Sequence, residues 1–204
     1  MLFLKRSVSI ALAFFIFILC AFSFTACSGE EGKKQDFLES ELDEIKEYIE
    51  IGKYKGLDVF SGDESPDRVI WKTVEKNFTL KEYPAAQVEY YRAQLETEYR
   101  YHARKDGKTE GEIDAILESS EADILAEAKA LTKSDLVYAA IVKLENISIS
   151  EDESEKFFDK YVEKYVSVYG YNAEYVKENM ADDIYSSMLY DKTTEFLLTN
   201  NNIK

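Results

Sequence analysis

Cysteine, proline, glycine and histidine are all scarce in this chain of 204 residues. Both cysteines, Cys20 and Cys27, lie close to the N-terminus, so the rest of the chain can form neither a disulfide nor a cysteine metal site. Two prolines and eight glycines are too few for a turn-rich β fold and favour long helices. Any His-based catalytic or metal arrangement would depend on His102 alone. Its helical spacing from Leu95 and Tyr99 indicates an ordinary helix residue.

Basic residues are outnumbered, with 25 Lys and Arg against 40 Asp and Glu, giving a formal net charge of -15. An acidic surface argues against nucleic acid as a partner, because phosphates require a basic face. It also argues against a protein that lies flat on anionic lipid. The sequence contains neither a Gly-rich phosphate loop nor a His-Glu-x-x-His pattern. We therefore expect no catalytic residue, no metal ion and no cofactor.

The first 26 residues have the order of an export signal. Lys5 and Arg6 precede an almost wholly apolar run from residue 8 to 24, and Phe24-Thr25-Ala26 leads into Cys27. This pattern predicts a lipoprotein signal peptide at 1–26, lipid on Cys27, a polar tether at 27–36 and a location on the extracytoplasmic face of a membrane. Cleavage would remove two positive charges and change the net charge from -15 to -17. A simple transmembrane anchor or an ordinary secretory signal remains an alternative.

Residues 37–75 are predicted to form a helix followed by an extended segment. Apolar residues have helical spacing from Phe37 to Tyr48, while 54–59 is typical of extended chain and 61–67 of a loop. Val69 to Val74 suggests a short strand or the approach to the next element. We place this extended segment near residues 47–74.

Residues 76–204 are predicted to be a helical domain. Pro84 suits a first helical position, and the helix behind it ends near Asp106-Gly107. Thr109 with Glu112 and Ser150 with Glu153 form capping-box patterns. The first opens a short helix, which we expect to precede a longer one at 121–146. Gly170 stops the helix after the second box. Asn172 caps one final helix that runs toward the C-terminus.

The order of several motifs then resembles the C-terminal domain of trigger factor, the bacterial chaperone that holds unfolded chains. The stretch from Asp123 through Ile203 carries this similarity in the motifs at 136–141, 145–147, 150–153, 169–171, 189–192 and 196–200. Upstream, 81–84 is similar to the start of that domain's first long helix. Residues 52–59 are similar to the segment before trigger factor's prolyl isomerase domain. That isomerase domain and the ribosome-binding domain have no counterpart here.

The resemblance implies a mainly α, elongated multi-helix fold of the trigger factor C-terminal or SurA-like chaperone kind. It also implies a non-enzymatic, membrane-anchored protein whose partners are unfolded or exported polypeptides, with no ribosome contact. The aromatic stripe of residues 151–169 suggests a client-binding surface formed by Phe157, Phe158, Tyr161 and Tyr165, unless these side chains pack in the core. A prolyl isomerase-type foldase and an envelope adaptor with one dedicated protein partner are the alternative functions.

Overall fold

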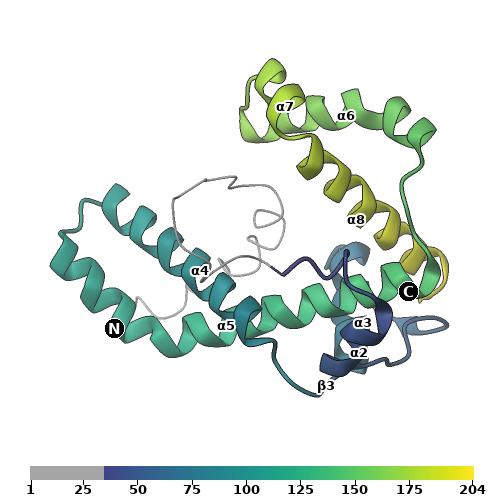
Figure 1. Ribbon diagram of the computed structural model, residues 1–204, viewed down its shortest axis with the longest axis horizontal. Helices are drawn as coiled ribbons and strands as arrows, with labels where there is room; N and C mark the ends of the chain where they lie inside the picture. The colour runs from purple at the N-terminus through teal and green to yellow at the C-terminus, as the bar shows by residue number, and fades with distance from the viewer. Residues whose placement is uncertain (1–34) are drawn as a thin grey trace. The chain divides into compact units, whose positions relative to one another are not determined.

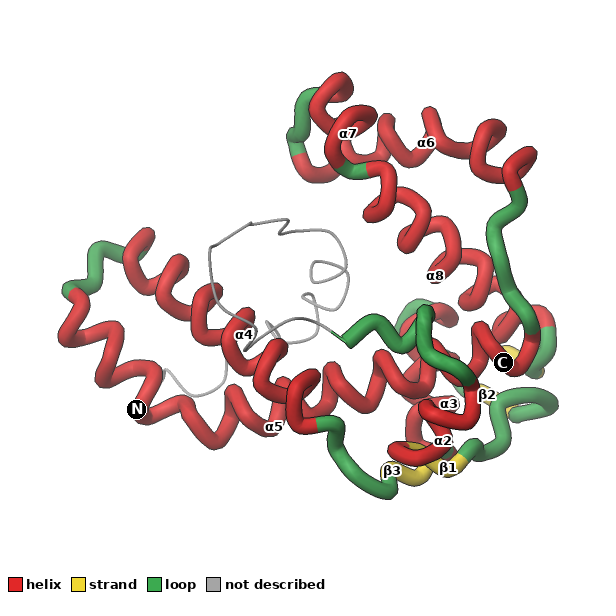
Figure 2. The backbone as a smooth tube through the Cα atoms, in the orientation of Figure 1, coloured by secondary structure: helices red, strands yellow, loops and turns green. Residues whose placement is uncertain are grey.

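The computed structural model describes residues 35–204, which divide into two compact units. The larger unit comprises residues 35–146 with the C-terminal residues 197–204, and the smaller unit comprises residues 147–196. The fold is mainly α, as the sequence predicted, and the strands drawn in yellow in Figure 2 are two residues long. None of the described helices is long and apolar enough to span a membrane.

The larger unit is built on a hairpin of two long helices, α4 (Ala85–Lys105) and α5 (Glu110–Glu145), which lie side by side in Figure 1. Pro84 is the residue just before α4, one position earlier than predicted. Gly107 adopts a positive φ of 76° in the turn between the two helices. The predicted capping box of Thr109 and Glu112 then opens α5.

Five shorter elements precede α4 in the larger unit. They are α2 (Leu42–Tyr48), β1 (Ile49–Glu50), β2 (Asp58–Val59), α3 (Pro66–Asn77) and β3 (Thr79–Leu80). β1 pairs with β3 in antiparallel orientation. Both α2 and α3 contact α5, because each directs buried aliphatic side chains toward it. The resulting core includes Ile45, Ile70, Val74, Leu136 and Ile141.

The C-terminus returns to the larger unit. β4 (Asn202–Ile203) pairs in parallel with β2, so that Val59 lies opposite Ile203. Asn201 fixes this return: its side-chain amide donates to the carbonyl of Tyr54 at 3.0 Å and accepts from the backbone N–H of Leu57 at 2.8 Å. Chain segments about 145 residues apart in sequence are thereby joined through backbone groups.

The smaller unit consists of α6 (Glu151–Tyr169), α7 (Ala173–Asn179) and most of α8 (Ala181–Thr199), whose last turn belongs to the larger unit. Gly170 ends α6 in the left-handed conformation, with φ at 73°, as the sequence predicted. Asn172 caps α7 by accepting hydrogen bonds from the backbone N–H groups of Glu174 and Tyr175.

Four predicted elements differ from the structure. The helix predicted from Phe37 begins only at Leu42, after a turn at 37–39. The two helices predicted between Thr109 and Asn146 are one helix, α5, because residues 112–145 contain neither Gly nor Pro to interrupt it. The predicted last helix is instead two, α7 and α8, with the break at Met180, whose φ and ψ of -125° and 25° are not helical. Val69 to Val74 lies within α3, so a strand there is wrong and the extended segment ends at Ser65. Pro66 starts that helix at its first position, and α3 continues across the predicted boundary at residue 75.

Candidate functional site

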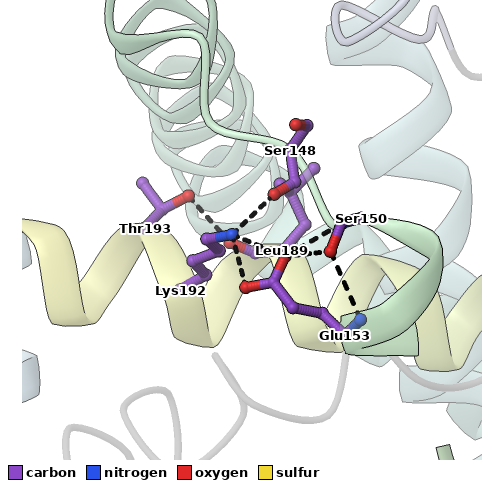
Figure 3. Close-up of polar contacts among 6 residues, drawn as sticks. All are labelled: Ser148, Ser150, Glu153, Leu189, Lys192 and Thr193. Atoms are coloured by element: carbon purple, nitrogen blue, oxygen red, sulfur yellow. Dashed lines mark hydrogen bonds and ion pairs between the residues drawn. The ribbon is translucent and has the colours of Figure 1, made fainter. Parts of the chain in front are cut away.

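The first turn of α6 is held by a capping box and by a lysine from α8. The Ser150 hydroxyl accepts from the backbone N–H of Glu153, whose carboxylate accepts in return from the N–H of Ser150. Lys192 Nζ donates to both oxygens of that carboxylate and to the carbonyl of Ser148 at 2.8 Å (Figure 3). Hydrogen bonds from Lys192, and then from Ser150, lower the pKa of Glu153 to about 2. These contacts tie the start of α6 to α8.

One face of α6 forms the core of the smaller unit. Val162 and Tyr165 are buried together with Val176 of α7 and with Ile184 and Met188 of α8. The hydroxyl of Tyr165 lies 3.1 Å from Ser187 Oγ, so its polar end has a partner inside the packed core. Partly buried side chains close the edges of this core: Ile149, Phe158, Tyr161, Tyr169 and Tyr171.

A neighbouring side of α6 keeps apolar side chains exposed. Phe157, Tyr161 and Val168 follow one another at intervals of four and seven residues, which places them on one side of the helix. Phe157 is 36% exposed and Val168 is 64% exposed, while Tyr161 is half-buried. We call these three residues the α6 flank. Large apolar side chains gathered on one side of a helix are typical of an interaction surface.

Polar contacts hold Tyr161 in place on the α6 flank. Its hydroxyl donates to Asp191 Oδ2 of α8 at 2.7 Å. Burial and this carboxylate raise the pKa of Tyr161 above its usual value, so the phenol stays protonated and donating. Lys164 Nζ lies 5.5 Å from the centre of the Tyr161 ring and 3.7 Å from Asp191. These contacts orient the Tyr161 ring.

The four aromatic residues predicted as a binding surface lie in three different environments. Phe157 and Tyr161 lie on the α6 flank, and Phe158 is half-buried at the edge of the core. Tyr165 is only 1% exposed and belongs to the core, so its prediction as a surface residue is wrong. The stripe on α6 is broader than one contact face, and only the positions of α7 and α8 decide which of its columns is covered.

Two further exposed residues, Val168 and Tyr175, lie on α6 and α7. Val168 completes the α6 flank at helical spacing from Phe157 and Tyr161, a signal already present in the sequence. Tyr175 of α7 is 51% exposed, and its ring stacks on that of Tyr171 with the centroids 6.2 Å apart. Tyr171 lies in the turn that joins α6 to α7, and Tyr175 lies in α7 just after it.

The polar residues inside the larger unit have a structural explanation. The buried side chain of Gln87 and the hydroxyl of Tyr91 both donate to Asp135 Oδ2, which joins α4 to α5. Burial, followed by the Asp135 charge, raises the pKa of Tyr91. Gln87 also accepts from the backbone N–H of Gln35 at 2.9 Å. Each of these contacts joins neighbouring segments of the unit, as in other buried polar networks.

The remaining positions considered from the sequence are His102, possible metal ligands and Cys27. The side chain of His102 is 53% exposed, with Nε2 3.8 Å from Glu98 of the same helix. Among residues 35–204, no cluster of His, Cys, Asp and Glu has the arrangement of a metal site. Cys27, the predicted lipidation site, lies outside the described residues, so its modification stays a prediction.

Comparison with known proteins gives a family for most of the helical chain. The family model for the C-terminus of the bacterial trigger factor protein (TF) matches residues 63–199, which is more than half of the chain. The matched span runs from α3 through α8 and confirms the resemblance that the sequence motifs indicated. No curated protein and no solved structure matches the chain.

Proposed function

Because the chain belongs to the family of the bacterial trigger factor C-terminus, we propose that it is a chaperone-like protein that holds unfolded or exported polypeptides. In this proposal it acts by binding, without a catalytic step. The matched region is the C-terminal part of trigger factor and not its prolyl isomerase domain, which favours a binding role over a foldase.

The exposed α6 flank is the observation that carries this proposal. Phe157, Tyr161 and Val168 offer an aromatic and aliphatic surface whose orientation the contacts of Glu153 and Asp191 maintain. When an apolar segment of an unfolded chain lies on such a surface, apolar area is removed from water. This burial is favourable by about 25 cal/mol of free energy per Å². Tyrosine suits varied partners, because it combines a flat apolar body with a polar tip.

The anchor is the second part of the proposal. We infer that lipid on Cys27 holds the protein on the extracytoplasmic face of a membrane, as the apolar run and small residues before that cysteine suggest. The lipid would then serve as the tether in place of the ribosome. Several acyl chains are needed for a durable anchor, because one chain binds membranes reversibly. Mass spectrometry of the N-terminal peptide from membranes tests this, and an unmodified Cys27 would contradict it.

Suppression of client aggregation tests the holding function. The chain from residue 28 onward is mixed with a chemically unfolded client, and light scattering is followed as denaturant is diluted. We expect scattering to fall in proportion to the added protein. A variant with Phe157→Ser and Val168→Ser should lose most of this effect. A control with Phe60→Ser and Tyr101→Ser, which changes two exposed aromatics of the larger unit, should keep it. Unchanged scattering at large molar excess of the native protein would contradict the proposal.

A further inference from the structure

Charged residues are sorted by sign around α6. Lysines recur every fourth residue at 156, 160 and 164, and carboxylates recur with the same period at 155, 159 and 163. Because a helix turns once in 3.6 residues, each set forms its own row along the axis. All six side chains belong to exposed residues. We call the three lysines the lysine row.

The lysine row borders the α6 flank. Lys156 Nζ lies 5.0 Å from the centre of the Phe157 ring, and Lys164 Nζ lies 5.5 Å from the centre of the Tyr161 ring. Each of these two ammonium groups lies over a ring face, while both lysines remain exposed to solvent. One side of α6 therefore combines an apolar edge with a line of positive charge.

Most of this positive charge is available to a partner. Lys164 has a neighbour in Asp191 at 3.7 Å, whereas Lys156 and Lys160 take part in no ion pair among residues 35–204. On the carboxylate side, Asp159 is paired with Lys177 of α7 at 2.7 Å. The lysine row is thus directed to solvent beside the very residues proposed to hold a client.

The spacing of the lysine row fits a polypeptide. Ammonium groups four residues apart on a helix repeat about every 6 Å along its axis. Alternate side chains of an extended segment repeat at about 6.6–6.8 Å, so carboxylates at alternate positions can follow the row. Apolar side chains between them would then reach Phe157, Tyr161 and Val168.

We propose that the α6 flank and the lysine row together select client segments in which acidic and apolar residues alternate. This inference rests on the proposed holding function and names the class of polypeptide it prefers. Within a chain of net charge -15, the lysine row gives acidic segments a local site on a surface that otherwise repels them.

A polypeptide fits the lysine row better than an anionic membrane does. Residues 147–196 contain 12 Asp and Glu against 5 Lys, so a flat anionic bilayer would also face many carboxylates. The carboxylate row borders the lysine row on the side away from the α6 flank, because Asp159 and Glu163 each lie three residues beyond a lysine of the row. A segment lying over the seam between the lysine row and the α6 flank therefore meets the lysines before the carboxylates.

Binding of three labelled peptides to the chain from residue 28 onward tests this inference. The peptides share their apolar residues and carry Glu, Gln or Lys at the alternate positions. We expect the Glu peptide to bind most tightly and to weaken as salt is added. The double variant Lys156→Gln with Lys160→Gln should bind it roughly threefold to thirtyfold more weakly, the range for two exposed ion pairs. Lys76→Gln with Lys105→Gln removes the same charge from exposed lysines of the larger unit and should leave binding unchanged.

Equal affinity for the three peptides would overturn the selectivity and leave the holding function standing, whereas binding of none would overturn both. Equal losses in the two double variants would also overturn it, because net charge alone would then explain the effect. Two further assays test whether the lysine row binds a lipid surface or a second copy of the chain instead. Lysine-dependent binding to phosphatidylglycerol vesicles without peptide preference would assign the row to lipid. Lysine-dependent dimerisation in sedimentation, again without peptide preference, would assign it to a second copy of the chain.

Discussion

Lys192 of α8 donates hydrogen bonds to both carboxylate oxygens of Glu153, with its Nζ atom 2.7 Å from one oxygen and 2.8 Å from the other. The same carboxylate caps the first turn of α6 through Ser150. The Glu153 side chain therefore takes part in both the local helix cap and a contact between two helices. Because α6 carries the candidate surface, this contact helps to hold the helix that presents Phe157 and Tyr161.

The stability of the smaller unit should depend on pH through Glu153. Its pKa is about 2 in the folded protein against an ordinary value of 4.5. A lowered pKa stabilises the fold fully above the unfolded-state value, and this contribution is lost as pH falls from about 4.5 toward 2. We expect Glu153→Gln to be less stable than the native protein at neutral pH, with the deficit shrinking toward about pH 3. Denaturant unfolding at a series of pH values measures it.

Glu155→Gln is the control for that series. Glu155 lies on the exposed carboxylate row of α6, so its substitution should change stability little at any pH. A Glu153→Gln deficit that stays constant down to the acid transition would contradict the assigned role of the Lys192 contact.

Gly52 should not tolerate a side chain. A Cβ atom at this position would lie 1.9 Å from the backbone carbonyl oxygen of Asn77, at the end of α3, and a backbone atom cannot move aside as a side chain can. We expect Gly52→Ala to lower the free energy of unfolding by about 1–3 kcal/mol. Gly111→Ala, in the first turn of α5 with open space around it, should instead be neutral or stabilising by up to about 1 kcal/mol. Similar unfolding midpoints for the two variants would refute this packing argument.

Asn201 should be the key residue of the C-terminal return. Replacing it with Ala leaves the carbonyls of Tyr54 and Leu197 without their amide donor and the N–H of Leu57 without its acceptor. These hydrogen bonds are half-buried, so their loss should cost about 1 kcal/mol, below the full penalty for deeply buried groups. Hydrogen exchange should show faster exchange at Leu57 in Asn201→Ala. Asn202→Ala, at an exposed position of β4, should have a smaller effect, and equal effects would argue against the special role of Asn201.

Helix ends were predictable from sequence because they depend on a few adjacent residues. The boxes at Thr109 and Ser150 and the stop at Gly170 all appear in the structure, since each satisfies backbone groups within one turn. The burial of Tyr165 was not predictable, because it depends on Ser187 and Met188 of α8, about 20 residues later.

Other features depend on still longer contacts. The pairing of β2 with β4 places Val59 opposite Ile203. A strand of two residues is too short for its local sequence to predict so distant a partner. The lysine row was visible in the sequence as a period of four, but its meaning required the exposure of Phe157 and Val168 beside it. Sequence periodicity gives the rows of a helix, and packing decides which of them face solvent.

Mapping where an unfolded client binds tests the central claim most directly. Amide and methyl NMR signals of the isotopically labelled chain from residue 28 onward are followed as an unfolded, aggregation-prone polypeptide is added. We predict that the largest shifts occur at Phe157, Tyr161 and Val168, and that Phe157→Ser with Val168→Ser weakens binding. Shifts confined to the α4–α5 hairpin, or no shifts at saturating client, would contradict a holding role for the α6 flank.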